Sequence, residues 1–216
     1  MPLRLHFHPL SSYCWKVLVA LYETGTPFEP VTVDLSDETS RAAFLALWPM
    51  GKFPVLEDTD RGEVVPESSA IIDYLDLHYP GHRHLVPTSP DLAGRTRFWD
   101  RFFDLHTHES MQKIVGDRIR PADEKSPFVV TKARATLASA YDVLEPAAAS
   151  RTWFSGGEFG LADCAAAPAL FYADRVQPLG KAHGAISAYL DRLQARPSFS
   201  RVLTEAEPYF WMFPTA

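Results

Sequence analysis

The spacing of the apolar residues changes near residue 80, and this change constrains the fold more than any other feature of the sequence. Before it, short strand-like runs and amphipathic segments follow one another in the order βαβ and then ββα. The stretch 81–90 contains two prolines, and beyond it only helical spacing is found. We therefore predict a mixed α/β domain in residues 1–80, a linker at 81–90 and an all-helical domain in 91–216.

Capping and breaking residues place the individual elements. Strands are predicted at 3–7, 29–33, 54–57 and 63–65. Helices of the first domain are predicted from the Ser11-Ser12 turn to about Gly25, at 40–47, and from Glu67-Ser68 to just before Pro80. The second domain should hold one long helix at about 91–118, one around 137–144, and further helices from Leu161, Ala182 and Ser198. A kink is expected at Pro168, which removes a backbone hydrogen bond.

Composition and charge exclude several classes of protein. The net charge is −6, with 6 Lys and Arg against 12 Asp and Glu in residues 1–85 and 15 of each in 86–216. Because there is no basic stripe, we expect no nucleic-acid groove. We also expect no membrane association and a cytoplasmic location, because the sequence shows neither a long apolar run nor a secretion signal. Two cysteines are too few for a disulfide framework or a structural zinc site, so no metal site is predicted.

The turn Ser11-Ser12-Tyr13-Cys14 lies between the first strand and the first helix. Unpaired N–H groups and the helix dipole stabilise an anion at such a helix start, and a thiolate is one such anion. Redox proteins carry a C-x-x-C pair at this turn, but Ser11 takes the first position here, and serine cannot form a mixed disulfide. The Ser11 hydroxyl could donate a hydrogen bond to a ligand's thiolate, or only cap the helix. Cys14 is interpreted as a small buried residue.

Two further stretches favour a peptide ligand. Phe53 precedes Pro54 at a strand start, a setting that favours a cis peptide and leaves the Phe53 backbone free to pair with a peptide. Glu67 and Ser68 stand at another helix start, where Ser68 would bind a carboxylate and Glu67 an ammonium group. A small peptide with a central thiol and an amino-acid end meets all these requirements, and glutathione is that peptide.

The residues at these positions resemble the cytosolic glutathione S-transferase superfamily over almost the whole chain. The matching stretches are 11–17, 49–56, 67–75 and 159–163, in that order. The resemblance implies a thioredoxin-like βαβαββα domain followed by an all-helical domain, in a cytoplasmic homodimer that binds glutathione. It also implies that Ser11 is the catalytic residue, because it would stabilise the glutathione thiolate.

Further roles follow from the resemblance. Phe53 before cis-Pro54 would pair with the cysteinyl backbone of glutathione, and Glu67 with Ser68 would hold the γ-glutamyl end. Lys52 would reach the glycyl carboxylate. An apolar electrophile would bind between the two domains. For this co-substrate pocket we predict Tyr13, Phe103, Arg175 and Trp211.

Some positions depart from the family pattern. Gly160 stands where the family commonly has Ser or Thr before Asp163, so the capping box is half present. The 11–15 stretch and Arg175 also resemble the zeta class, which isomerises maleylacetoacetate, but Tyr13 stands where that class has Cys. The leading prediction is therefore an enzyme that conjugates glutathione to a hydrophobic electrophile. A glutathione-dependent cis-trans isomerase and a non-catalytic binding protein are the alternatives.

Overall fold

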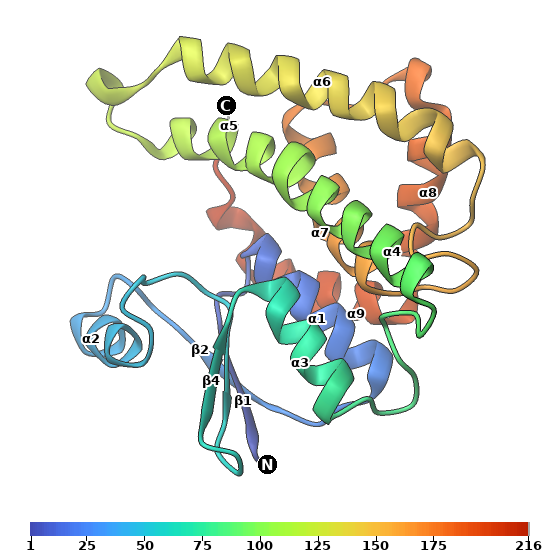
Figure 1. Ribbon diagram of the computed structural model, residues 1–216. Helices are drawn as coiled ribbons and strands as arrows, with labels where there is room; N and C mark the ends of the chain where they lie inside the picture. Colours follow the sequence, from blue (N-terminus) through green and yellow to red (C-terminus); the bar gives the residue numbers. More distant parts are fainter. Residues whose placement is uncertain (216) are drawn as a thin grey trace.

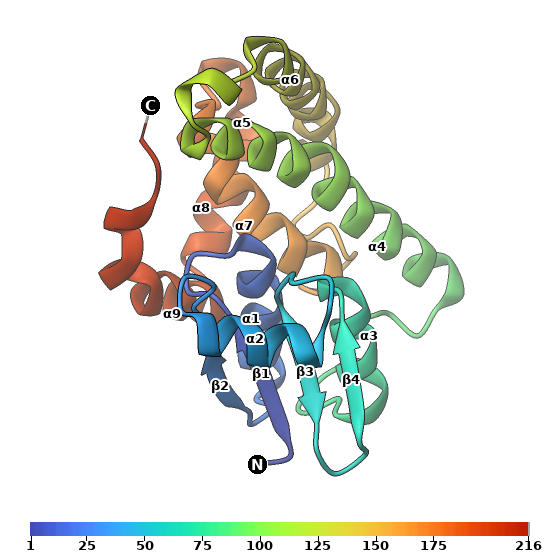
Figure 2. The same cartoon turned by 90° about the vertical axis from the view of Figure 1, so that its left-hand side faces the viewer.

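The computed structural model describes residues 1–215 and begins with a four-stranded sheet. Its strands are β1 (Leu3–Phe7), β2 (Glu29–Thr32), β3 (Val55–Asp58) and β4 (Glu63–Pro66). They lie in the order β2-β1-β3-β4, with β1 and β2 parallel and the other pairs antiparallel, as Figure 2 shows face-on. The central strand β1 buries Leu3 and Leu5. Each strand lies within one residue of its predicted ends.

Helices cover both faces of this sheet. The helices α1 (Ser12–Thr24) and α3 (Ser68–His78) lie between the sheet and the helical domain, and α2 (Glu38–Leu47) covers the opposite face (Figure 1). Phe44 of α2 packs on Val33 and Val55 there. The predicted element order βαβαββα is confirmed.

The remainder of the chain is helical and packs around one buried helix. Its main helices are α4 (Pro90–Phe102), α5 (Glu109–Ile119), α6 (Pro127–Ala149), α7 (Leu161–Val176), α8 (Gly184–Gln194) and α9 (Pro197–Ala206). Shorter helical segments are η1 (Phe103–His108), η2 (Ala122–Glu124), η3 (Lys181–His183) and η4 (Glu207–Met212). The central helix α7 contacts α1, α4, α5 and α8, and most of its side chains are buried. No helix within residues 1–215 is long and apolar enough to cross a bilayer.

The long helix predicted at about 91–118 is not uniformly α-helical. Residues Phe103–His108 form a π-helical segment between α4 and α5. Such a segment inserts extra backbone into the turn and changes which side chains face inward. Here it buries Asp104 and His108, which the sequence analysis did not assign to the site.

The N-terminus of α7 explains the departure at Gly160. A Cβ at this position would clash with the Leu85 carbonyl oxygen, so no side chain can be accommodated there. The Asp163 carboxylate still accepts a hydrogen bond from the Gly160 N–H at 3.0 Å. The hydroxyl that position 160 lacks is replaced by Ser155, whose Oγ accepts from the Ala162 N–H at 3.1 Å. Asp163 thus has a structural role.

Candidate functional site

Ser11 stands at the N-cap of α1, where its backbone is extended and its Oγ accepts a hydrogen bond from the Cys14 N–H at 3.3 Å. This bond occupies a lone pair of the oxygen and leaves the hydroxyl proton free to be donated. Within residues 1–215 the hydroxyl donates no hydrogen bond to an oxygen or nitrogen, and the neighbouring Cys14 thiol is only a weak acceptor. Ser11 can therefore both cap the helix and donate a hydrogen bond to a ligand.

The neighbouring Ser12 has a buried hydroxyl that is already hydrogen-bonded to other side chains, so it is not available to a ligand as the Ser11 hydroxyl is. Its hydroxyl is buried, accepts a hydrogen bond from Gln112 Nε2 at 3.2 Å, and also bonds His108 Nε2. Burial lowers the pKa of His108 to about 3, and the Lys16 ammonium adds to this effect. The imidazole is therefore neutral near pH 7, and the Ser12 hydroxyl is hydrogen-bonded to both Gln112 and His108 Nε2. Ser12 is thus engaged in a buried network with two side chains of the helical domain, whereas Ser11 is not.

Cys14 is fully buried in the first turn of α1. Burial raises the pKa of its thiol to about 12, so the thiol stays protonated and is inaccessible to substrates. This environment matches its interpretation as a small core residue. The nucleophile at this turn must come from a ligand.

Because His108 is buried and neutral, we expect the free energy of unfolding to depend on pH. Because the unfolded chain binds a proton near pH 6.5 and the folded chain does not until about pH 3, acid stabilises the unfolded state. We expect this group to lower the free energy of unfolding by about 2 kcal/mol between pH 7 and pH 5. Urea unfolding at both pH values should show this loss in the wild type and not in His108→Gln. The exposed His84→Gln variant is the control, and equal losses in wild type and His108→Gln would contradict the assignment.

A polar groove lies beside Ser11 and brings together most of the predicted glutathione-binding residues. It encloses about 190 Å³ and is lined by Tyr13, Lys52, Phe53, Pro54, Glu67, Ser68, Ser69, Arg101, Asp104 and Leu105. The Phe53-Pro54 peptide bond is cis, as predicted. Glu67 has a positive φ of 69°, which is uncommon for a residue with a side chain and is typical of binding sites.

The groove carries charges of both signs. Lys52 and Arg101 are cationic, and Glu67 and Asp104 are anionic. Glutathione has two carboxylates and one ammonium group, so this set of charges fits it. The first N–H groups of α3, beginning at Ser68, have no partner inside the helix and are suited to bind a carboxylate.

Ser69, Arg101 and Asp104 were missed from the sequence. Ser69 follows the predicted pair directly, but its neighbours in space are far along the chain: its Oγ donates to Asp100 Oδ2 at 2.8 Å. Asp104 lies four positions after Asp100 and three after Arg101, so on a helix its side chain neighbours both of them. This group of charged residues in an otherwise aromatic helix could have indicated a polar site. The sequence alone does not show that the group lies next to residues 67–69 in the fold.

A second cavity, of about 360 Å³, adjoins the groove at Phe53, which lines both. Its walls are largely apolar, with Ser11, Ser12, His8 and Gln112 as polar members. The other lining residues are Leu10, Phe53, Met111, Val115, Ile119, Tyr172, Met212, Phe213 and Pro214. Ser11 therefore stands where a thiol bound in the groove could meet an apolar molecule in the cavity.

None of the four co-substrate residues predicted from the sequence lines the second cavity. Phe103 is fully buried against Phe154 because the π-helical segment turns it into the core. Trp211 is 82% exposed and does not line the second cavity, while Met212 and Phe213 do. Tyr13 lines the polar groove and stacks on His108 at 3.9 Å between ring centroids.

Arg175 is also placed outside the second cavity. Its guanidinium lies 3.7 Å from the centroid of Phe171 and 5.5 Å from that of Phe210. No Arg or Lys is among the residues that line this cavity. The cavity consequently offers no strong cation for an anionic co-substrate.

Comparisons with known proteins agree with this fold. Residues 5–83 match the family model of the glutathione S-transferase N-terminal domain, and residues 127–203 match that of the C-terminal domain. Glutathione S-transferase 3 of Zea mays is 34% identical over 210 residues, which cover 94% of this chain and 93% of the relative. A stringent starvation protein A homolog of Haemophilus ducreyi is 30% identical, with 91% of this chain and 87% of that protein covered. The solved structure of a glutathione S-transferase of Methylobacterium radiotolerans, in complex with glutathione sulfonate, is 29% identical, has a TM-score of 0.80 and covers 93% of both chains.

The fold and the groove together define a protein with a thioredoxin-like domain followed by a helical domain. The chain belongs to the glutathione S-transferase family, whose members are transferases.

Proposed function

We propose that the enzyme binds glutathione in the polar groove, stabilises its thiolate with Ser11, and adds the sulfur to a neutral apolar electrophile in the second cavity. The observation that carries this proposal is the Ser11 hydroxyl, which lines the second cavity and donates no hydrogen bond to an oxygen or nitrogen within residues 1–215, while Phe53 lines both that cavity and the groove. The N–H groups at the start of α1 add to the stabilisation. Electrostatic stabilisation of this kind makes a nucleophile available near neutral pH.

Different residues of the groove would bind different parts of glutathione. The Phe53 backbone would pair with the cysteinyl unit, and Lys52 with the glycyl carboxylate. Ser68 at the α3 N-terminus would bind the γ-glutamyl carboxylate, and Glu67 would pair with the ammonium group. Holding both reactants in adjoining sites lowers the entropic part of the barrier.

The reaction itself needs no group from the protein beyond Ser11. The thiol releases its proton to solvent, the sulfur forms a bond to the electrophilic carbon, and the leaving group departs with its electron pair. The Ser11 hydroxyl remains a hydrogen-bond donor throughout. We also propose that the protein is a cytoplasmic homodimer, as the family resemblance implies. The large apolar side chains of Leu77 on α3 and Phe98 on α4 are exposed in the single chain, which supports a subunit interface on this surface.

The lining of the second cavity favours conjugation over the isomerase reaction. Maleylacetoacetate is anionic, and burying an unpaired carboxylate is costly. We expect turnover of 1-chloro-2,4-dinitrobenzene with glutathione, and a kcat/KM for maleylacetone isomerisation at least about a hundredfold lower. Both are measured by absorbance with the purified protein.

A variant at the cavity rim sharpens this comparison. Ile119 lines the cavity and is largely exposed, so Ile119→Arg supplies a cation without disturbing the core. This variant should raise kcat/KM for maleylacetone isomerisation relative to kcat/KM for conjugation of 1-chloro-2,4-dinitrobenzene. Efficient isomerisation by the wild type would establish the isomerase alternative, and absence of glutathione binding would establish the non-catalytic one.

A further inference from the structure

His8 lines the second cavity together with Ser11, but the mechanism proposed above uses only Ser11. The two residues are the ends of one tight turn, because the Ser11 N–H donates to the His8 carbonyl oxygen at 3.0 Å. The Cα atoms at the ends of such a turn are less than about 7 Å apart. The imidazole of His8 and the hydroxyl of Ser11 therefore border the same cavity from neighbouring positions.

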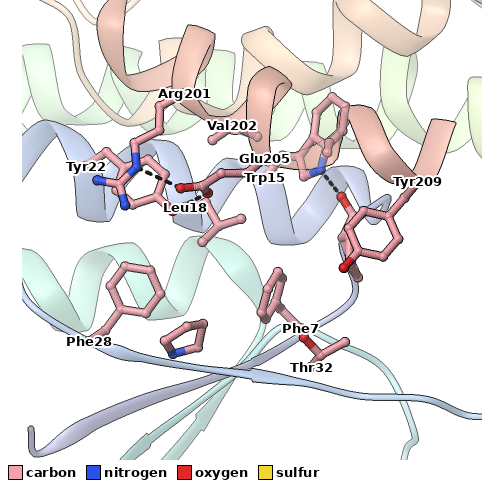
Figure 3. Close-up of a pocket in the computed structure, with 13 residues that line it drawn as sticks. Phe7, Trp15, Leu18, Tyr22, Phe28, Thr32, Arg201, Val202, Glu205 and Tyr209 are labelled. Carbon is pink, nitrogen blue, oxygen red and sulfur yellow. Dashed lines mark hydrogen bonds and ion pairs between the residues drawn. The ribbon is translucent and has the colours of Figure 1, made fainter.

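The two residues inside this turn are bonded to the protein core. The Leu10 carbonyl oxygen accepts a hydrogen bond from Tyr172 Oη at 2.9 Å. Pro9 and Trp15 line a different pocket, shown in Figure 3, where Trp15 Nε1 donates to the Pro9 carbonyl oxygen. These contacts fix the turn before a substrate binds, as a catalytic hydrogen-bond donor requires.

The contacts of the His8 ring show which of its nitrogens is free. The Leu10 N–H donates to Nδ1 at 3.2 Å, so in the neutral ring the proton is on Nε2. Burial lowers the pKa of His8 by more than the Asp34 carboxylate raises it, so the ring is neutral near pH 7. Within residues 1–215, Nε2 makes no hydrogen bond or ion pair and is not enclosed. The ring also stacks on Phe53, with 5.7 Å between centroids and 16° between planes, so the free donor has a fixed orientation.

The class of electrophile decides whether such a donor affects the rate. When the sulfur displaces a leaving group, the negative charge departs with that group. When it adds to a double bond conjugated with a carbonyl group, the negative charge moves to the carbonyl oxygen, and a charge without a partner is costly in an apolar cavity. Of the polar side chains that line this cavity, Ser11 is assigned to the thiolate, and Gln112 Nε2 donates to Ser12 at 3.2 Å. His8 is the remaining one.

We propose that His8 is a further catalytic residue, whose Nε2–H donates a hydrogen bond to the carbonyl oxygen of a neutral α,β-unsaturated ketone or aldehyde while the glutathione sulfur adds to its β-carbon. This inference rests on the proposed function and names one class of substrate for it. The sulfur–carbon bond forms, the electron pair of the double bond shifts toward the carbonyl group, and the oxygen becomes an enolate. Water then protonates the α-carbon, which balances the proton that the thiol released to solvent, so no other reactant is consumed.

The test compares two neutral substrates with the purified full-length protein. The first, trans-4-phenyl-3-buten-2-one, has the carbonyl oxygen, and the second, benzyl chloride, has no oxygen. His8→Phe keeps a ring against Phe53 but removes the donor, so the ratio of kcat/KM for the enone to kcat/KM for benzyl chloride should fall about ten- to hundredfold. His8→Gln supplies an amide N–H and should recover part of this ratio. Because both variants lose the acceptor for the Leu10 N–H, the difference between them measures the donor alone.

His6 on β1 provides the matched control, because it precedes His8 by two positions and lines neither the groove nor the second cavity. Its Nε2 lies 3.2 Å from Glu57 Oε2. His6→Phe should leave the ratio unchanged, and the ultraviolet absorbance of bound thiolate should persist in His8→Phe. Equal losses of both activities in His8→Phe would overturn the role of His8. A wild-type protein that conjugates neither substrate would overturn the transferase proposal and this inference with it.

Discussion

Replacing Ser11 by alanine should lower kcat for conjugation by about 10²- to 10³-fold while changing the dissociation constant of glutathione by about threefold or less. The hydroxyl is the donor with a free proton at the start of α1, whereas the groove residues that hold the peptide are untouched. An interaction made mainly with the thiolate affects turnover more than binding. The checks are steady-state kinetics and ultraviolet difference absorbance of the bound thiolate across pH.

Two further variants distinguish a chemical role of Ser11 from its role as a helix cap. Loss of the cap alone costs about 0.5–2 kcal/mol of stability, and glycine at the same position recovers most of it. Ser11→Gly should therefore fold like the wild type and remain as slow as Ser11→Ala. Ser12→Ala, which removes a hydroxyl already bonded to His108 and Gln112, should keep thiolate formation. Wild-type turnover in Ser11→Gly would show that Ser11 only caps the helix.

The parts of the site that the sequence predicted are those that are local in the chain. Ser11 at a helix start, Phe53 before Pro54, and Glu67 with Ser68 each form within a few consecutive residues. Their roles depend on helix termini and an X-Pro bond, which a sequence pattern can indicate.

The parts that were missed depend on contacts between distant segments. Ser12 and His108 are 96 positions apart, and Lys16 and Asp104 are 88 apart. Phe103 was predicted to line the co-substrate pocket but lies in the core. The π-helical segment shifts the inward face of the helix by a fraction of a turn, and a periodicity of 3.6 residues cannot show this. In the C-terminal apolar stretch, Met212 and Phe213 line the second cavity, whereas Trp211 lies outside it and is 82% exposed, a difference that the composition of the stretch could not show.

The largest effect on stability is expected at Lys16, which is fully buried and joins the two domains. Its Nζ lies 2.6 Å from Asp100 Oδ1 and 2.8 Å from Asp104 Oδ2, and it donates to Ser69 Oγ at 2.8 Å. Burial would lower the pKa of Lys16, but the Asp104 and Asp100 carboxylates outweigh it and raise that pKa. Lys16→Met would leave two buried carboxylates without this cation, so the free energy of unfolding should fall by about 3–5 kcal/mol.

A surface ion pair on α5 provides the control. Lys113 Nζ lies 2.9 Å from Glu109 Oε1, with side chains 51% and 48% exposed. Because solvent screens this pair, Lys113→Met should cost less than about 1 kcal/mol. Urea unfolding of the two variants at pH 7 measures both effects. Equal losses would mean that the buried network contributes no more than a surface pair.

The pH dependence of Lys16→Met should identify the uncompensated carboxylates as the cause. Burial already raises the pKa of Asp100 with Lys16 present, and removing the cation raises it further. The folded variant then binds a proton more readily than the unfolded chain, so its stability should increase, relative to wild type, as the pH falls from 7 to 5. Adding Asp100→Asn should recover part of the loss at pH 7. Because Asp104 also lines the polar groove, the same network connects the packing of the two domains to the shape of that groove.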